Sequence, residues 1–165
     1  METLPLVPEP RRGGWGVAAQ LVATAFGAGY APVVPGTAGS AVGVLTFLAL
    51  HRLSPPLQVL VTLLAFGLGV VAATHTATRV GKKDPGIVVI DEVVGQWTSL
   101  LFLPFTPAIL FVGFVLFRIM DIVKPWPADA LEALPVGLGI MADDLMAGIY
   151  ANLLVRIALL VVPFA

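Results

Sequence analysis

The sequence predicts an all-α fold, a polytopic integral membrane helical bundle. Of its 165 residues, 58% are hydrophobic and 12% are charged, whereas about a quarter of the residues in soluble domains are charged. The mean hydropathy is +0.98. Six apolar runs follow one another along the chain, and several approach the ~17–25 residues that a membrane-crossing helix needs. We therefore expect about four to five transmembrane helices plus an N-terminal interfacial or re-entrant helix.

The apolar runs give the expected helices in order. The first, residues 15–29, is short, rich in Ala and Gly, and follows two arginines, which suits an interfacial or re-entrant helix as well as a crossing. The other runs cover residues 38–53, 57–78, 87–103, 106–120 and 141–163. Pro55-Pro56 and the segment PFTP at 104–107 separate neighbouring runs. Because proline ends helices and turns the chain, we expect a hairpin tip at each.

The distribution of cations predicts how the chain is oriented. We expect residues 1–14 to form an N-terminal cytoplasmic tail, since they lack the apolar stretch of a signal peptide, and residues 15–165 to form one membrane-embedded domain. Short loops rich in Lys and Arg stay in the cytoplasm. One orientation leaves only Arg52 outside and places on the cytoplasmic side Arg11, Arg12, Arg79, Lys82, Lys83, Arg118 and Lys124. It also gathers there all the acidic residues beyond the tail.

Composition excludes several kinds of chemistry. The chain has no cysteine, so disulfides, thiolate ligands and cysteine nucleophiles are excluded. A net charge of −1 without a basic stripe gives no reason to expect nucleic acid as a partner. Of the two histidines, His51 falls on the outer side and His75 inside an apolar run, which argues against zinc. Any chemistry must come from carboxylates, hydroxyls, amines or a metal.

Two acidic segments share the pattern D-x3-G-x-aromatic: DEVVGQW from Asp91 and DLMAGIY from Asp144. Because positions i and i+4 lie on one helix face, Gly95 and Gly148 would let the two helices approach closely and bring their acids together. Crowded carboxylates repel unless a cation lies between them. We expect Mg²⁺, or alternatively Mn²⁺, held by Asp91, Glu92, Asp143 and Asp144. The alternative is that each acid is a solvated helix end.

Two further segments suit a phosphate group. In VPGTAGSAVG, residues 34–43, three glycines flank Thr37 and Ser40 before a helix, so a loop there could aim N–H groups and hydroxyls at a phosphate. The alternative is an ordinary helix start capped by one of those hydroxyls. Arg118, Asp121 and Lys124 recur at i, i+3 and i+6. Their two cations could hold a phosphate monoester, or pair with the aspartate and with lipid headgroups.

In this order and spacing, four segments resemble the phosphatidylglycerophosphatase A family of bacterial membrane phosphatases: PGTAGSAVG, KKDPGIVVIDEVVGQW, FRIMDIVKPWPADALE and GLGIMADDLMAGIYANLL. The resemblance covers residues 22–155. It implies a Mg²⁺-dependent hydrolase of phospholipid biosynthesis that converts phosphatidylglycerophosphate to phosphatidylglycerol at the cytoplasmic face of the bacterial inner membrane. It also implies that the site contains Asp84, Asp91, Glu92, Asp121, Asp143 and Asp144.

For such a phosphatase, the residues leave two mechanisms open. Without cysteine or a well-placed histidine, the nucleophile is either a metal-activated water or a carboxylate. We favour water, with Asp84 or Asp121 as the base, while an aspartyl-phosphate on one of the carboxylates stays open. The groups expected to bind the substrate phosphate are Thr37, Ser40, Lys83, Arg118 and Lys124.

A cation- or proton-coupled membrane transporter is the alternative from another class. Its sites usually lie at mid-membrane depth, whereas these acids gather near one surface, so we favour the enzyme. The sequence does not predict the oligomeric state.

Overall fold

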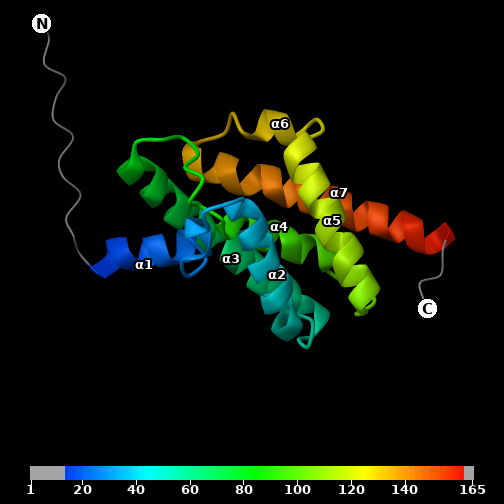
Figure 1. Cartoon of the computed structure of the whole chain (residues 1–165). Coiled ribbons are helices and arrows are strands. Elements are labelled where there is room, and N and C mark those ends of the chain that lie inside the picture. Colours follow the sequence, from blue (N-terminus) through cyan, green and yellow to red (C-terminus); the bar gives the residue numbers. More distant parts are fainter. Residues whose placement is uncertain (1–13, 162–165) are drawn as a thin grey trace, which may run out of the picture.

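The computed structural model describes residues 14–161, and in this range the ordered elements are all helices (Figure 1). They are α1 (Gly14–Ala23), the 3-10 helix η1 (Ala28–Tyr30), α2 (Pro35–Leu50), α3 (Pro55–Val80), α4 (Ile90–Leu100), α5 (Pro107–Val123), α6 (Ala128–Leu131) and α7 (Val136–Val161). The predicted all-α class is confirmed. The predicted N-terminal tail, except for its last residue, lies outside the described residues.

Proline and glycine set several helix boundaries, as the sequence predicts. Proline lies in the first turn of α2, α3 and α5, where the first N–H groups of a helix have no internal partner to lose. α3 ends at Gly81 with φ of 72°, a left-handed conformation that glycine adopts without strain. The two predicted hairpin tips lie side by side. The ring of His51, near the first tip, stacks on that of Phe105 in the second, with centroids 3.7 Å apart.

Among the described helices, α3 and α7 are long and apolar enough to cross a membrane. Each has 26 residues, which gives a length of about 39 Å against a hydrocarbon core of about 30 Å. α2 and α5 are shorter, with 16 and 17 residues. By length and composition the structure supports two spans, so the larger expected number stays a prediction. α1 has only 10 residues, which suits an interfacial or re-entrant helix better than a crossing.

α4 is the central element of the bundle. It packs against α2, α3, α5 and α7, which surround it in Figure 1, and most of its 11 residues are buried. Two of its polar residues hydrogen-bond to each other inside the bundle. Gln96 donates from Nε2 to Ser99 Oγ over 2.8 Å, and both side chains are fully buried. A short helix therefore carries Asp91 and Glu92, which lie in its first turn, into the interior.

α4 and α7 pack in parallel through two glycines, as the repeated D-x3-G-x-aromatic pattern predicts. A Cβ on Gly148 would collide with the carbonyl oxygen of Gly95, and a Cβ on Gly95 would lie 2.7 Å from the carbonyl oxygen of Asp144. One turn further along, Asn152 Nδ2 donates to Ser99 O over 3.1 Å. The two residues of this contact are 53 positions apart in the sequence, as are Gly95 and Gly148. The helices therefore run in the same direction with their backbones in contact.

The expectation of a glycine-rich loop over residues 34–43 is wrong, because α2 begins at Pro35. The glycines of this segment face α4: a Cβ on Gly39 would lie 2.8 Å from Val89 Cβ, and one on Gly43 would lie 2.7 Å from Gln96 Cβ. They let α2 and α4 approach closely. The alternative expectation, that Thr37 or Ser40 caps this helix, is also wrong. Val34 is the N-cap, and no side chain caps the helix.

α7 begins earlier than the apolar run predicts, at Val136 rather than near residue 141. Its first turns pack on α3 through Gly137, where a Cβ would lie 2.9 Å from Thr74 N. Asp143 and Asp144 therefore lie about two turns inside the helix. For this pair, the alternative of solvated helix ends is wrong, since both are buried.

The glycine contact predicts opposite effects for two substitutions. Gly148→Ala places a methyl group against the Gly95 carbonyl and should destabilise the fold by about 1–3 kcal/mol through overpacking. Gly67→Ala on α3 is the matched control, because nothing lies within 4 Å of its Cβ position, and better helix propensity should stabilise it by up to about 1 kcal/mol. Thermal unfolding in detergent measures both changes. Equal effects would contradict the proposed role of the contact.

Candidate active site

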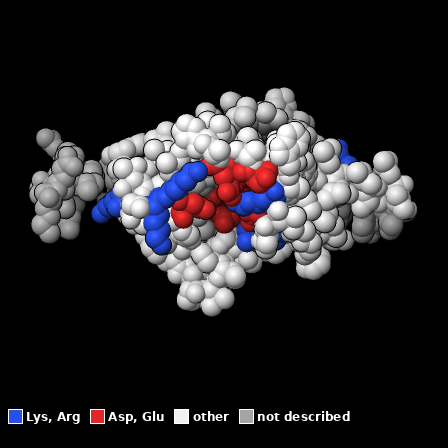
Figure 2. Space-filling view, turned by 90° about the horizontal axis from the view of Figure 1, so that it is seen from above, with Lys and Arg blue, Asp and Glu red and all other residues white. Residues whose placement is uncertain are grey.

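One cavity of about 360 Å³ collects most of the predicted site residues. Its walls come from α4, α7, the end of α5, the start of α2 and the connection 84–88. Viewed from above, as in Figure 2, carboxylates lie in a hollow with lysine and arginine on its flanks. The lining acids are Asp84, Asp91, Glu92, Asp121, Asp143 and Asp144, and the lining cations are Arg118 and Lys124.

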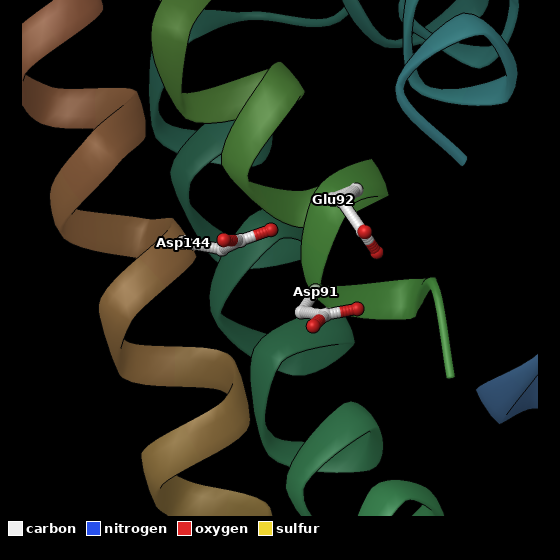
Figure 3. A group of neighbouring side chains, drawn as sticks. All are labelled: Asp91, Glu92 and Asp144. Atoms are coloured by element: carbon white, nitrogen blue, oxygen red, sulfur yellow. The ribbon is translucent and has the colours of Figure 1, made fainter. Parts of the chain in front are cut away.

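Three carboxylates converge within this cavity (Figure 3). Asp91 and Glu92 on α4 and Asp144 on α7 each offer an oxygen, and these oxygens lie within 4.8 Å of one another. Asp91 and Asp144 are only 9% and 3% exposed. At least one buried oxygen of each residue has no hydrogen-bond partner among residues 14–161, namely Asp91 Oδ1, Glu92 Oε2 and Asp144 Oδ2.

This arrangement fits a hard divalent cation. Buried oxygens without a partner are costly, and like charges this close repel unless a cation separates them. Three carboxylate oxygens and no nitrogen or sulfur ligand suit Mg²⁺ or Mn²⁺ better than zinc. Asp91, Glu92 and Asp144 are therefore the residues that would hold the ion.

Arg118 connects this acidic group to Asp121 on its own helix and to Ser40 on α2. Its Nη1 atom lies 2.5 Å from Asp121 Oδ2, 3.9 Å from Glu92 Oε1 and 3.4 Å from Ser40 Oγ. Gly36 leaves room for the guanidinium, since a Cβ there would lie 3.1 Å from both terminal nitrogens. One arginine thus partly balances the acids and joins α5 to α2.

Lys124 forms a second cationic centre on the cavity wall. Its Nζ atom lies 2.6 Å from Asp143 Oδ2 and also pairs with Glu132. Burial alone would lower the pKa of Lys124, but its hydrogen bonds to Asp143 and Glu132 outweigh this effect and raise the pKa above its ordinary value. Lys124 therefore remains charged at neutral pH.

The structure separates residues that the sequence analysis grouped together. Asp143, expected to hold the metal with its neighbour, instead pairs with Lys124 and lies outside the group of three. Thr37 and Ser40 do not line the cavity, and Ser40 is fully buried with its hydroxyl donating to Gly36 O over 2.9 Å. Lys83 lines a smaller adjoining cavity of about 70 Å³.

Two features of the site carry no clear signal in the sequence. Glu132 lies in a polar connection, yet it pairs with Lys124 and lines the smaller cavity. Gly36 on α2 makes room for Arg118 on α5, a helix far from it in the sequence. Both depend on contacts between segments far apart in the chain. A hydroxyl-flanked glycine and an acid in a linker are common without such roles.

Comparisons with known proteins agree on one family. The sequence model of phosphatidylglycerophosphatase A matches residues 21–159. Phosphatidylglycerophosphatase A of Escherichia coli K12 is 39% identical over 131 residues, covering 78% of this chain and 76% of that protein. The Haemophilus influenzae Rd protein of the same name is 38% identical over 138 residues, covering 82% of this chain and 85% of its own length.

A third relative carries a different name. A Bacteroides thetaiotaomicron protein, provisionally named a phosphatidylinositol-3-phosphatase, is 38% identical over 147 residues, covering 84% of this chain and 91% of that protein. No solved structure gives a significant match to the chain.

The group of three carboxylates predicts opposite effects of one substitution on cation binding and on stability. Asp144→Asn removes a charged ligand, so Mn²⁺ affinity should fall by roughly 10–100-fold or more. Without metal, the variant should unfold at a higher temperature, because the change relieves repulsion with Asp91 and Glu92. Electron paramagnetic resonance of Mn²⁺ and thermal unfolding measure the two effects.

Asp129→Asn is the matched control for this test. Asp129 is exposed and lies outside the cavity, and its amide keeps an oxygen to accept the bond from Ala130 N. Both measurements should match the unsubstituted protein. Unchanged Mn²⁺ affinity in Asp144→Asn would refute the metal site.

Proposed function

The chain belongs to the phosphatidylglycerophosphatase A family, and we propose that it is a Mg²⁺-dependent lipid phosphatase converting phosphatidylglycerophosphate to phosphatidylglycerol and phosphate. Family membership makes it a phosphoric monoester hydrolase. The observation that carries the finer proposal is the convergence of three buried carboxylates beside two cationic side chains in one cavity. A metal ion and a phosphate group are complementary to these two kinds of charge.

The residues divide into groups that hold a metal and groups that hold a phosphate. A divalent cation bound to Asp91, Glu92 and Asp144 would polarise the phosphoryl oxygens and lower the pKa of a water. Arg118 and Lys124 line the same cavity and would neutralise charge on the phosphoryl group as it is transferred. Their present carboxylate partners, Asp121 and Asp143, keep both side chains oriented before substrate binds.

We favour a water nucleophile with Asp84 as its base. Asp84 lines the cavity and is exposed, so water reaches it without displacing an ion pair. Asp121 also lines the cavity, but its carboxylate is already engaged in an ion pair with Arg118 at 2.5 Å. Direct attack by a carboxylate stays open as the alternative mechanism. The buried oxygens of Asp91 and Asp144 that lack a hydrogen-bond partner support these two carboxylates as candidate nucleophiles for that mechanism.

The surface supports placing the chain in the bacterial cytoplasmic membrane. Large apolar side chains project from the longest helices, including Leu63, Leu64 and Leu68 on α3 and Leu160 on α7, each at least 58% exposed. Apolar surface of this extent marks a contact with lipid or another protein. The acids that line the cavity gather on the face of the molecule seen in Figure 2. Under the cation asymmetry this face lies on the cytoplasmic side, which favours the enzyme over a transporter with a mid-membrane site.

The first test of the proposed function is phosphate release from defined lipids by the purified protein. With Mg²⁺, we expect release from phosphatidylglycerophosphate at a higher kcat/KM than from phosphatidylinositol 3-phosphate, the substrate class suggested by the provisionally named relative. Chelation should abolish release and added Mg²⁺ should restore it. Asp91→Asn should lower kcat by several orders of magnitude while Asp129→Asn stays near the unsubstituted rate. A near-normal rate for Asp91→Asn would refute this assignment.

The second test concerns orientation and uses the absence of native cysteine. A thiol at Ser54→Cys, in an exposed hairpin tip, should react with an impermeant reagent in intact bacterial cells. A thiol at Lys83→Cys, in the exposed segment beside the cavity, should react only after the membrane is opened. The reverse pattern of labelling would overturn the cytoplasmic placement of the site.

A further inference from the structure

The rim of the charged cavity has an apolar component that the chemistry above does not use. Four large aliphatic side chains line the cavity: Val34, Val88, Ile122 and Ile140. Val88 and Ile140 are buried, whereas Val34 and Ile122 are 60% and 71% exposed. Two exposed aliphatic side chains thus border a space whose interior carries carboxylates, arginine and lysine. Water-filled sites for small charged substrates have no need of such a border.

Val34 and Ile122 mark the seam between the start of α2 and the end of α5. Deeper in the bundle Arg118 closes this seam, because its guanidinium lies beside Gly36 and contacts Ser40 Oγ at 3.4 Å. Ile122 follows Arg118 by one helical turn, about 6 Å toward the end of α5, and Val34 precedes the first residue of α2. Both therefore lie beyond the closed part of the seam, and both line the cavity while remaining largely exposed.

The outer face of α5 continues this apolar border away from the cavity. Phe111, Ile119 and Ile122 recur at i, i+8 and i+11, so they share one side of the helix. Their exposed fractions are 69%, 44% and 71%. An apolar path therefore leads along α5 to the rim of a charged cavity. The only common ligand with this combination of an apolar chain and a charged head is an amphiphile.

We propose that Val34 and Ile122 form a lateral portal for a glycerophospholipid. The phosphorylated headgroup passes between them into the cavity, while the glycerol backbone and acyl chains stay against the outer faces of α2 and α5. Side entry is favourable because a lipid extracted into water would expose its chains, and every CH₂ group contributes to membrane affinity. This inference rests on the proposed function and deepens it by assigning how the lipid reaches the site.

The portal predicts that acyl chains decide which substrates depend on it. The cavity also opens on the face seen in Figure 2. A water-soluble headgroup, made by removing the acyl chains from phosphatidylglycerophosphate, enters through this opening and does not need the portal. A lipid held in a bilayer must pass through the portal.

A reversible cross-link tests this difference. In the cysteine-free chain, Val34→Cys and Ile122→Cys are joined by bis-methanethiosulfonate reagents of graded length. The matched control joins Val33→Cys to Val123→Cys. Val33 and Val123 are next to Val34 and Ile122 in the sequence and are 73% and 64% exposed. Neither of them lines the cavity. Phosphate release is measured from lipid vesicles and from the soluble headgroup. Each rate is expressed relative to the same sample after reduction.

We expect the portal cross-link to lower kcat/KM for the lipid by about tenfold or more and for the soluble headgroup by less than about twofold. The control cross-link should change neither. Equal loss for both substrates would mean that the cross-link distorts the site, and unchanged lipid hydrolysis would mean that the lipid enters elsewhere. Either result overturns the portal.

A second measurement separates the portal from the proposed function. Reduced protein that releases phosphate from neither substrate contradicts the function. The portal is then decided by the rate at which maleimide modifies the thiols of Val34→Cys and Ile122→Cys in vesicles. Phosphatidylglycerophosphate, compared with phosphatidylglycerol, should protect these thiols and leave those of Val33→Cys and Val123→Cys unprotected. Absence of this selective protection overturns the portal.

Discussion

The backbone contact between α4 and α7 is the constraint on which the site depends. Gly95 and Gly148 leave no space for a side chain between the two helices. Because the helices are parallel, the contact fixes Asp91 and Asp144 one turn away, opposite one another and close enough to share an ion. α2 closes on the other side of α4 through its own glycines. Small residues at helix interfaces here serve chemistry as well as packing, because they set the spacing of the carboxylates.

This spacing has an electrostatic cost. Asp91, Glu92 and Asp144 are crowded in a site largely removed from water, and each has an oxygen without a partner. Arg118 offsets part of the charge, with Nη1 3.9 Å from Glu92 Oε1, whereas Lys124 is engaged by Asp143. The remaining imbalance favours a cation, so metal binding and folding stability are linked.

Because α4 is short, its last backbone carbonyls lie inside the bundle and need hydrogen-bond donors, which α7 supplies. α4 ends at Leu100, and unsatisfied carbonyls in apolar surroundings are costly. Asn152 Nδ2 donates to the carbonyls of Thr98, Ser99 and Leu101 at 3.0–3.2 Å. Arg156 Nη2 adds a bond of 3.2 Å to Leu101 O. Arg156, which lies inside the apolar run 141–163, therefore stabilises the end of a short central helix.

The sequence by itself determined the all-α class, the proline-marked hairpin tips and the pairing of α4 with α7, because these follow from local periodicity and from a repeated pattern. It also identified the acids and cations that the cavity collects. Only the tertiary structure decided how Asp143 and Asp144 divide, one toward Lys124 and the other toward Asp91 and Glu92. Adjacent helical residues point about 100° apart, and which of them meets a partner depends on how α7 packs against α3, α4 and α5. The same holds for residues 34–43, because a glycine suits a loop or a close helix contact equally well until its neighbour is known.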